Sequence, residues 1–198
     1  MSEDKGIRRK SVLSWAFYDW ANSAFSTTVV AGFFPVFFRE YWSAGGDVGE
    51  TTLKLGYANS LASIIVAALA PLLGAIADRG GAKKKFLFFF AAMGIVMTGS
   101  LYMVAKGDWM LAVFLYVAAL IGFSGGNIFN DSLIIGVAEP REMDMVSAFG
   151  FSMGYLGGGL LYFVNMAMLL WPHAFGLDGE SAAVRVSFIS VAIWWALF

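Results

Sequence analysis

Six long apolar stretches dominate the sequence and restrict its possible folds more than any other feature. They lie at residues 11–38, 52–77, 86–105, 109–138, 145–171 and 183–198. About 20 apolar residues cross the hydrocarbon core of a bilayer as a helix. Hydrophobic residues make up 59% of the chain and charged residues 14%, whereas a soluble domain carries roughly 25% charged residues. The sequence therefore predicts a membrane protein with six spanning segments.

The spanning segments are predicted to be helices. Backbone groups in lipid must pair within the protein, so a span is either a helix or a strand of a closed barrel. Barrel strands alternate in polarity over about ten residues, and the run at 86–92 does not alternate. We therefore predict an all-α fold in which residues 1–198 form one six-helix transmembrane bundle. The sixth stretch is short and ends at Phe198, so we expect that the second six-helix half of a longer protein is absent here.

The distribution of basic residues predicts the orientation. Nine lysines and arginines lie on the side of the N-terminus and four on the other side of the predicted membrane. Lysine and arginine accumulate in cytoplasmic loops, so we expect the N-terminus in the cytoplasm.

Few residues offer covalent or metal chemistry. The chain has no cysteine and a single histidine, His173, so neither a thiolate metal site nor a multi-histidine site can form. The segment 80–83 lacks the spacing of a phosphate-binding loop. The net charge of −1 gives no reason to expect a nucleic-acid partner. We expect that the protein is not an enzyme and that it has no catalytic residue, no metal and no cofactor.

The most specific motif follows the second apolar stretch, at Gly74–Lys85 (GAIADRGGAKKK). It combines the end of a helix, a two-glycine turn and a basic cluster suited to anionic lipid. Its spacing resembles the loop between helices two and three of the major facilitator superfamily. In that superfamily the loop latches the two halves of the transporter together on the cytoplasmic side. The resemblance implies the latch residues Gly74, Asp78, Arg79, Gly81, Lys83 and Lys84.

The first apolar stretch narrows this resemblance. The segment Ser14–Phe25 (SWAFYDWANSAF) resembles the opening signature of the autophagy-related vacuolar effluxer-like branch of the superfamily. The resemblance implies the N-terminal half of a transporter, built from 3+3 inverted repeats, whose partner is the missing C-terminal half. It also implies a small-molecule substrate, with amino acids as the branch-level expectation.

Two carboxylates lie inside predicted spans, where ionisable residues are costly and mark functional candidates. Asp19 shares a helix face with Asn22, three positions on, and Asp131 shares a face with Asn127, four positions back. In the superfamily, the first and fourth helices line the central cavity. Our hypothesis is that Asp19, Asn22, Asn127 and Asp131 contribute to a site for the substrate or a coupling ion, either a proton or sodium. The alternative, that they bond to neighbouring helices and only fix the packing, stays open.

The fifth stretch is rich in glycine at Gly150–Gly159. Glycines about four residues apart let helix backbones approach closely, which predicts packing roles for Gly150, Gly154, Gly158 and Gly159. The pattern also resembles an antiporter motif of the superfamily, but Tyr155 replaces its proline.

Taken together, these features predict a multi-pass protein of a bacterial inner membrane that moves a small solute by alternating access. We expect its helices to contact the lipid bilayer. Two alternatives remain: a transport-inactive scaffold or receptor with the same fold, and a membrane enzyme, which the lack of a nucleophile–base pair disfavours.

Overall fold

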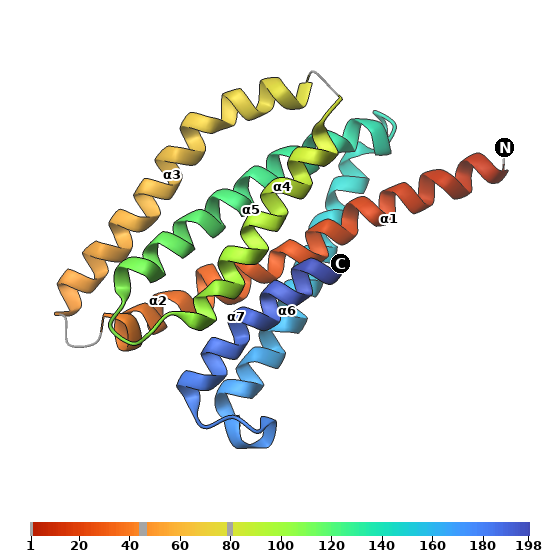
Figure 1. Ribbon diagram of the computed structural model, residues 1–198. Coiled ribbons are helices and arrows are strands. Elements are labelled where there is room, and N and C mark those ends of the chain that lie inside the picture. Colours follow the sequence, from red (N-terminus) through yellow and green to blue (C-terminus); the bar gives the residue numbers. More distant parts are fainter. Residues whose placement is uncertain (1, 44–46, 79–80) are drawn as a thin grey trace.

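The computed structural model describes residues 2–43, 47–78 and 81–198, with side chains described from residue 9 onward except that of Asp78. Within these residues the chain is helical throughout, with no strand (Figure 1). The elements are α1 (Ser2–Ala24), η1 (Phe25–Phe33), α2 (Phe34–Phe37), η2 (Phe38–Trp42), α3 (Val48–Asp78), α4 (Lys83–Ser100), η3 (Leu101–Met103), α5 (Trp109–Val137), α6 (Met143–Leu170), η4 (Pro172–Phe175) and α7 (Glu180–Leu197).

Six helical segments are long and apolar enough to cross a membrane, as the sequence predicted. They are Arg9–Trp42, Val48–Ala77, Lys83–Met103, Trp109–Val137, Met143–Leu170 and Glu180–Leu197. The first span runs four residues past the predicted boundary at residue 38. It continues because the chain winds through two π-helical segments, η1 and η2, on either side of the short α2 that contains Pro35. Proline has no backbone N–H to donate, so Pro35 interrupts the regular hydrogen bonding of the helix. The hydrophobicity of the sequence alone does not predict the π-helical geometry on either side of it.

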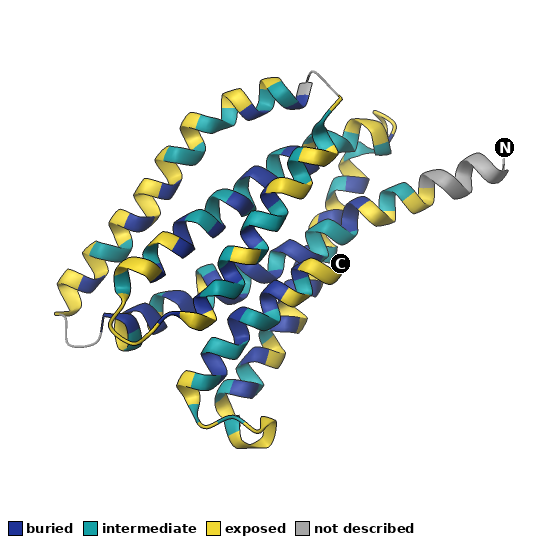
Figure 2. Cartoon of the chain, in the orientation of Figure 1, coloured by how far each residue is buried: buried dark blue, intermediate teal, exposed yellow. Residues whose placement is uncertain are grey.

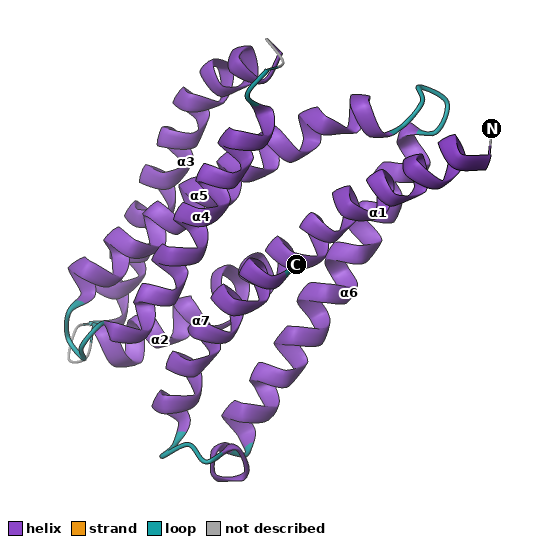
Figure 3. Cartoon of the chain, turned by 45° about the vertical axis from the view of Figure 1, so that its right-hand side comes forward, coloured by secondary structure: helices purple, strands orange, loops and turns teal. Residues whose placement is uncertain are grey.

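The helices differ in how much of their surface lies inside the bundle. Of an apolar stretch of 18 residues within each span, 56% is buried in the first span and 44% in α5. The corresponding shares are 17% in α3 and 22% in α4 (Figure 2). The span beginning with α1 packs mainly on α6, whereas α3 and α4 pack mainly on α5 (Figures 1 and 3). The first span and α5 therefore form the centre of the bundle, while α3 offers most of its surface to lipid.

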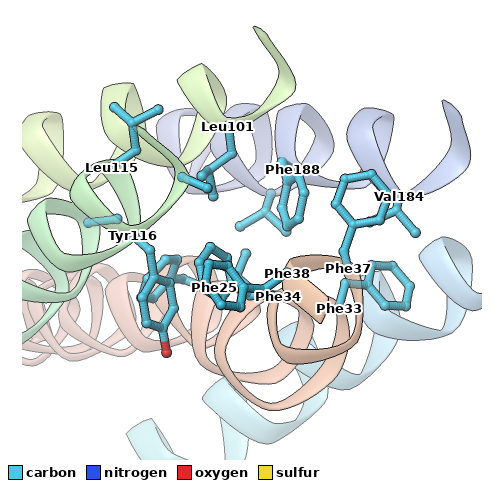
Figure 4. Close-up of a cluster of buried hydrophobic side chains, with 14 of the residues drawn as sticks. Phe25, Phe33, Phe34, Phe37, Phe38, Leu101, Leu115, Tyr116, Val184 and Phe188 are labelled. Carbon is cyan, nitrogen blue, oxygen red and sulfur yellow. The ribbon is translucent and has the colours of Figure 1, made fainter. Parts of the chain in front are cut away.

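An aromatic cluster holds the first span, α5 and α7 together away from the N-terminus (Figure 4). The rings of Phe34 and Tyr116 stack with centroids 3.8 Å apart. Trp42, which has no exposed surface, stacks on Phe188 of α7 at 5.7 Å. Each such pair contributes about 0.5–1.5 kcal/mol beyond burial of its area, so this cluster fixes one end of the central helices.

Glycines bring α6 against α1. A Cβ added to Gly150 would lie 2.5 Å from a ring carbon of Trp15, and one added to Gly154 would lie 2.6 Å from the Ser23 hydroxyl oxygen. Gly158 faces the carbonyl oxygen of Ser23 in the same way, at 2.9 Å. No side chain fits at these positions without a shift of α1 or α6.

One predicted packing glycine is wrong, and another was missed. Gly159 is exposed, and a Cβ added there would meet no atom within 4 Å. Gly157 instead packs against Trp20. Adjacent helix positions point about 100° apart, so of three consecutive glycines only those on the α1 side can serve the contact.

Candidate functional site

The polar residues predicted on the first and fourth spans meet in the centre of the bundle. The side-chain amide nitrogen of Asn22 donates a hydrogen bond to the side-chain oxygen of Asn127. Asn22 is only 2% exposed, so this bond satisfies a buried polar group that would otherwise be costly. The bond joins α1 to α5 between residues more than 100 positions apart in the chain.

Two cavities adjoin this contact. The first, about 230 Å³, lies between α1, α5 and α6 and is lined by polar residues that include Asp19, Asn22, Ser26 and Asn127. The second, about 280 Å³, is lined by residues that include Asp19, Asn127, Asp131 and Ser147. We call them the polar cavities. They share three lining residues, Asp19, Asn127 and Phe151, so the four site residues predicted from the sequence line two neighbouring cavities.

The polar cavities are electronegative. Asp19 and Asp131 are the charged side chains among their described lining residues, and neither a lysine nor an arginine is among them. Carboxylate, amide and hydroxyl oxygens line the space, together with the faces of Phe123 and Phe151. Such an arrangement can accept a proton or stabilise a cation, because carboxylates are hydrogen-bond acceptors when ionised and aromatic faces attract positive charge.

The two carboxylates differ in their surroundings. Asp19 lines both polar cavities and is half-buried, whereas Asp131 lines only the second and is exposed. In the described part of the chain no salt bridge is found at either residue. Their positions leave both carboxylates accessible from the cavity space.

The backbone of α6 closes one wall. Gly154 lines the first cavity, and the Thr27 hydroxyl donates to the carbonyl oxygen of Gly158 at 3.2 Å. A side chain on either glycine would enter the space that Ser23 and Thr27 occupy. The glycines therefore set how close α6 comes to the polar face of α1.

Sequence reasoning missed the contribution of α6 to the site. Ser147, Phe151 and Gly154 follow one another at spacings of four and three, which places them on one helix face. That periodicity was visible in the sequence. Ser147 and Phe151 carry no charge, however, so they do not stand out within a span, and the glycines of the same segment were interpreted as packing residues. Only the cavity shows that this face turns toward Asp19.

The predicted latch residues lie at the junction of α3 and α4. The side chain of Asp78 and the whole of Arg79 fall outside the described residues. Lys83 donates from Nζ to the carbonyl oxygen of Ser132 at 3.0 Å, which ties the start of α4 to α5 one residue after Asp131. Gly81 and Lys84 are exposed.

Gly74 does not mark a close helix approach here. A Cβ added to it would meet no described atom within 4 Å. Its surroundings are open because α3 is the least buried span.

Comparisons with known proteins agree with this architecture. The model of the vacuole effluxer Atg22-like family matches residues 50–143. The chain is 38% identical over 187 residues to the uncharacterised MFS-type transporter YxiO of Bacillus subtilis (strain 168), which covers 93% of the chain and 44% of YxiO. It is 30% identical over 189 residues to the multidrug resistance protein MdtG of Escherichia coli (strain K12 / DH10B), covering 94% of the chain and 41% of MdtG. No solved structure matches the chain.

Six apolar spanning helices define an integral, multi-pass membrane protein, and the relatives to which it is similar are named as transporters or resistance proteins. These matches support the N-terminal six-helix half of a major facilitator superfamily protein. It spans less than half the length of the curated relatives it matches.

Proposed function

We propose that this six-helix unit is one half of a secondary transporter that moves a small solute across a membrane by alternating access. The observation that carries the proposal is the pair of polar cavities, which join the intramembrane carboxylates Asp19 and Asp131 through Asn127. Charged residues within spans are costly and are placed where a substrate or ion passes. In this proposal the polar cavities form this half's share of the solute or coupling-ion site.

The arrangement of helices supports a rocking mechanism. In transporters built from repeats, two bundles move largely as rigid bodies around a site near the middle of the membrane. The close glycine contact between α1 and α6 and the Asn22–Asn127 bond between α1 and α5 tie these three helices together, which favours their movement as one body. The cavities would then open alternately to either side as a second bundle moves against it.

Several finer features belong to the same proposal. The coupling ion is a proton or sodium, held at Asp19 or Asp131. The N-terminus faces the cytoplasm, and the membrane is a bacterial inner membrane. The junction of α3 and α4 latches the two halves on the cytoplasmic side.

For the solute we propose an amino acid, which rests on the resemblance to vacuolar effluxers and on the matching family model. A drug-like compound is the second candidate, because one relative is named as a multidrug resistance protein. Counterflow into proteoliposomes, with a panel of amino acids and a panel of organic cations, separates the two.

The experiment that tests the proposal replaces Asp19 with asparagine in the protein that the natural gene encodes. Solute flux into proteoliposomes is then measured with and without an ion gradient. The asparagine side chain keeps the shape of aspartate but cannot ionise. We expect gradient-driven flux to fall at least about tenfold, because a hydrogen bond to a charged group contributes about 1.5–3 kcal/mol and about 1.4 kcal/mol corresponds to a factor of ten.

The matched control is Asp108→Asn, the same substitution outside the polar cavities. Asp108 caps α5 by accepting from the backbone nitrogen of Leu111 at 3.3 Å, and asparagine caps equally well. Gradient-driven flux should persist in this control. If D19N transports at the wild-type rate with the same ion dependence, Asp19 has no part in the mechanism. If the wild-type protein moves no solute of either panel, the scaffold or receptor alternative gains.

A further inference from the structure

A third cavity, about 730 Å³, lies on another face of α1 at the end of the bundle nearer the N-terminus. It is formed where the beginning of α1, the beginning of α4 and the end of α5 come together, with Phe198 at its edge. It shares Trp15 with the second polar cavity but not Asp19 or Asp131. Its chemistry is therefore separate from that of the proposed transport site.

The third cavity has the opposite charge to the polar cavities. Lys10 and Lys84 line it from two different helices, and no carboxylate is among its described lining residues. The hydroxyl group of Ser14 adds a further hydrogen-bond donor. Two ammonium groups without a facing carboxylate favour an anion, because opposite charges at a partly dry surface attract more strongly than in water.

A buried, unpartnered donor lines the same cavity. Asn130 is 1% exposed, and its side-chain amide nitrogen has no hydrogen-bond partner among the described residues. Its backbone carbonyl oxygen is used, since it accepts from the indole nitrogen of Trp15 at 2.8 Å. This nitrogen has almost no accessible surface, so it lies behind the wall of the cavity and out of reach of a ligand.

The depth of the third cavity matches the headgroup level of a bilayer. Lys10, Lys84 and Val137 each lie at the end of a predicted span or next to it. Part of the wall is apolar and includes Leu87, Leu133 and Val137. A ligand here would thus meet two lysines at its anionic end and hydrocarbon at its other end.

We propose that the third cavity binds the phosphate headgroup of an anionic phospholipid from the surrounding leaflet. The phosphodiester would lie between Lys10 and Lys84, and a headgroup or phosphate oxygen would accept from the hydroxyl group of Ser14. The glycerol and the first part of the acyl chains would lie against Leu87 and Leu133. Basic pockets between spanning helices are known to suit such headgroups.

The test compares two double variants of the full natural protein that remove the same charge from the same segments. K10Q/K84Q removes both lysines that line the cavity, and R9Q/K85Q removes two neighbouring exposed cations that do not. Binding of dioctanoyl-phosphatidylglycerol to the delipidated protein is measured by native mass spectrometry, with dioctanoyl-phosphatidylcholine as the zwitterionic reference. We expect K10Q/K84Q to weaken binding of the anionic lipid about 30-fold, from about 1 kcal/mol for each lysine. We expect R9Q/K85Q to change it less than about threefold, because exposed charges contribute little.

A third variant tests the shape of the cavity without changing its charge. Gly136 lines the third cavity, and a Cβ added there would meet no atom within 4 Å, so Gly136→Leu fills the space without disturbing the helices. This variant should also weaken binding of the anionic lipid.

Equal losses in the two double variants would overturn the proposal, because they would indicate general attraction to basic residues. Equal binding of both lipids, or displacement of the lipid by inorganic phosphate at the same concentration, would overturn it too.

Discussion

The contact between α1 and α6 can be tested at two neighbouring glycines, Gly158 and Gly159, which differ only in the side of α6 to which they point. Alanine at position 158 would place its Cβ 2.9 Å from the Ser23 carbonyl oxygen and 2.9 Å from the Thr27 hydroxyl oxygen. Carbon atoms pack best at about 3.5–4.0 Å. The α1 backbone would therefore have to move by about half an ångström or more, since a carbonyl cannot rotate aside as a flexible side chain does.

The expected free-energy costs follow from these distances. Overpacking of a tight interface by one methyl group costs about 1–3 kcal/mol. Alanine at position 159 meets no atom within 4 Å, so it gains the helix preference of alanine over glycine, up to about 1 kcal/mol. The two variants should therefore differ by about 1–4 kcal/mol in the free energy of unfolding, or about 2–16 °C in melting temperature for a chain of this size.

The measurement is thermal unfolding of both variants and the wild type in one detergent, followed by circular dichroism. G158A should melt below the wild type and G159A at or above it. Melting temperatures of the two variants that agree within about 2 °C, too little for a difference of 1 kcal/mol, would refute the assignment of Gly158 to the helix contact. The added Cβ would also displace the Thr27 hydroxyl, which lines the first polar cavity, so G158A should reduce solute flux as well.

Two further predictions concern the core of the site and the orientation in the membrane. Asn127→Leu removes the acceptor of the buried Asn22 amide, so it should destabilise the protein by about 1–3 kcal/mol in the same melting experiment, and an unchanged melting temperature would show that the bond is not formed. The chain has no cysteine, so single cysteines report sidedness cleanly: in intact cells a membrane-impermeant maleimide should label His173→Cys but not Gly81→Cys, both at exposed positions. The reverse labelling would place the N-terminus outside the cytoplasm.

The sequence by itself determined the six spans, because the length of an apolar stretch is a local property that the bilayer thickness selects directly. It also singled out Asp19 and Asp131, since a charge within a span is unusual wherever it lies in the fold. The exact end of the first span at Trp42 was not predictable, because η1 and η2 follow π-helical geometry around Pro35.

Only the tertiary structure decided which polar faces meet. The Asn22–Asn127 bond, the contribution of Phe151 to the site and the choice of Gly157 over Gly159 depend on how helices distant in sequence are rotated against one another. A helical period places residues on a face but leaves the direction of that face undetermined. Rotation is set by the packing of small residues and rings across the interfaces, an interaction between segments that no local pattern contains.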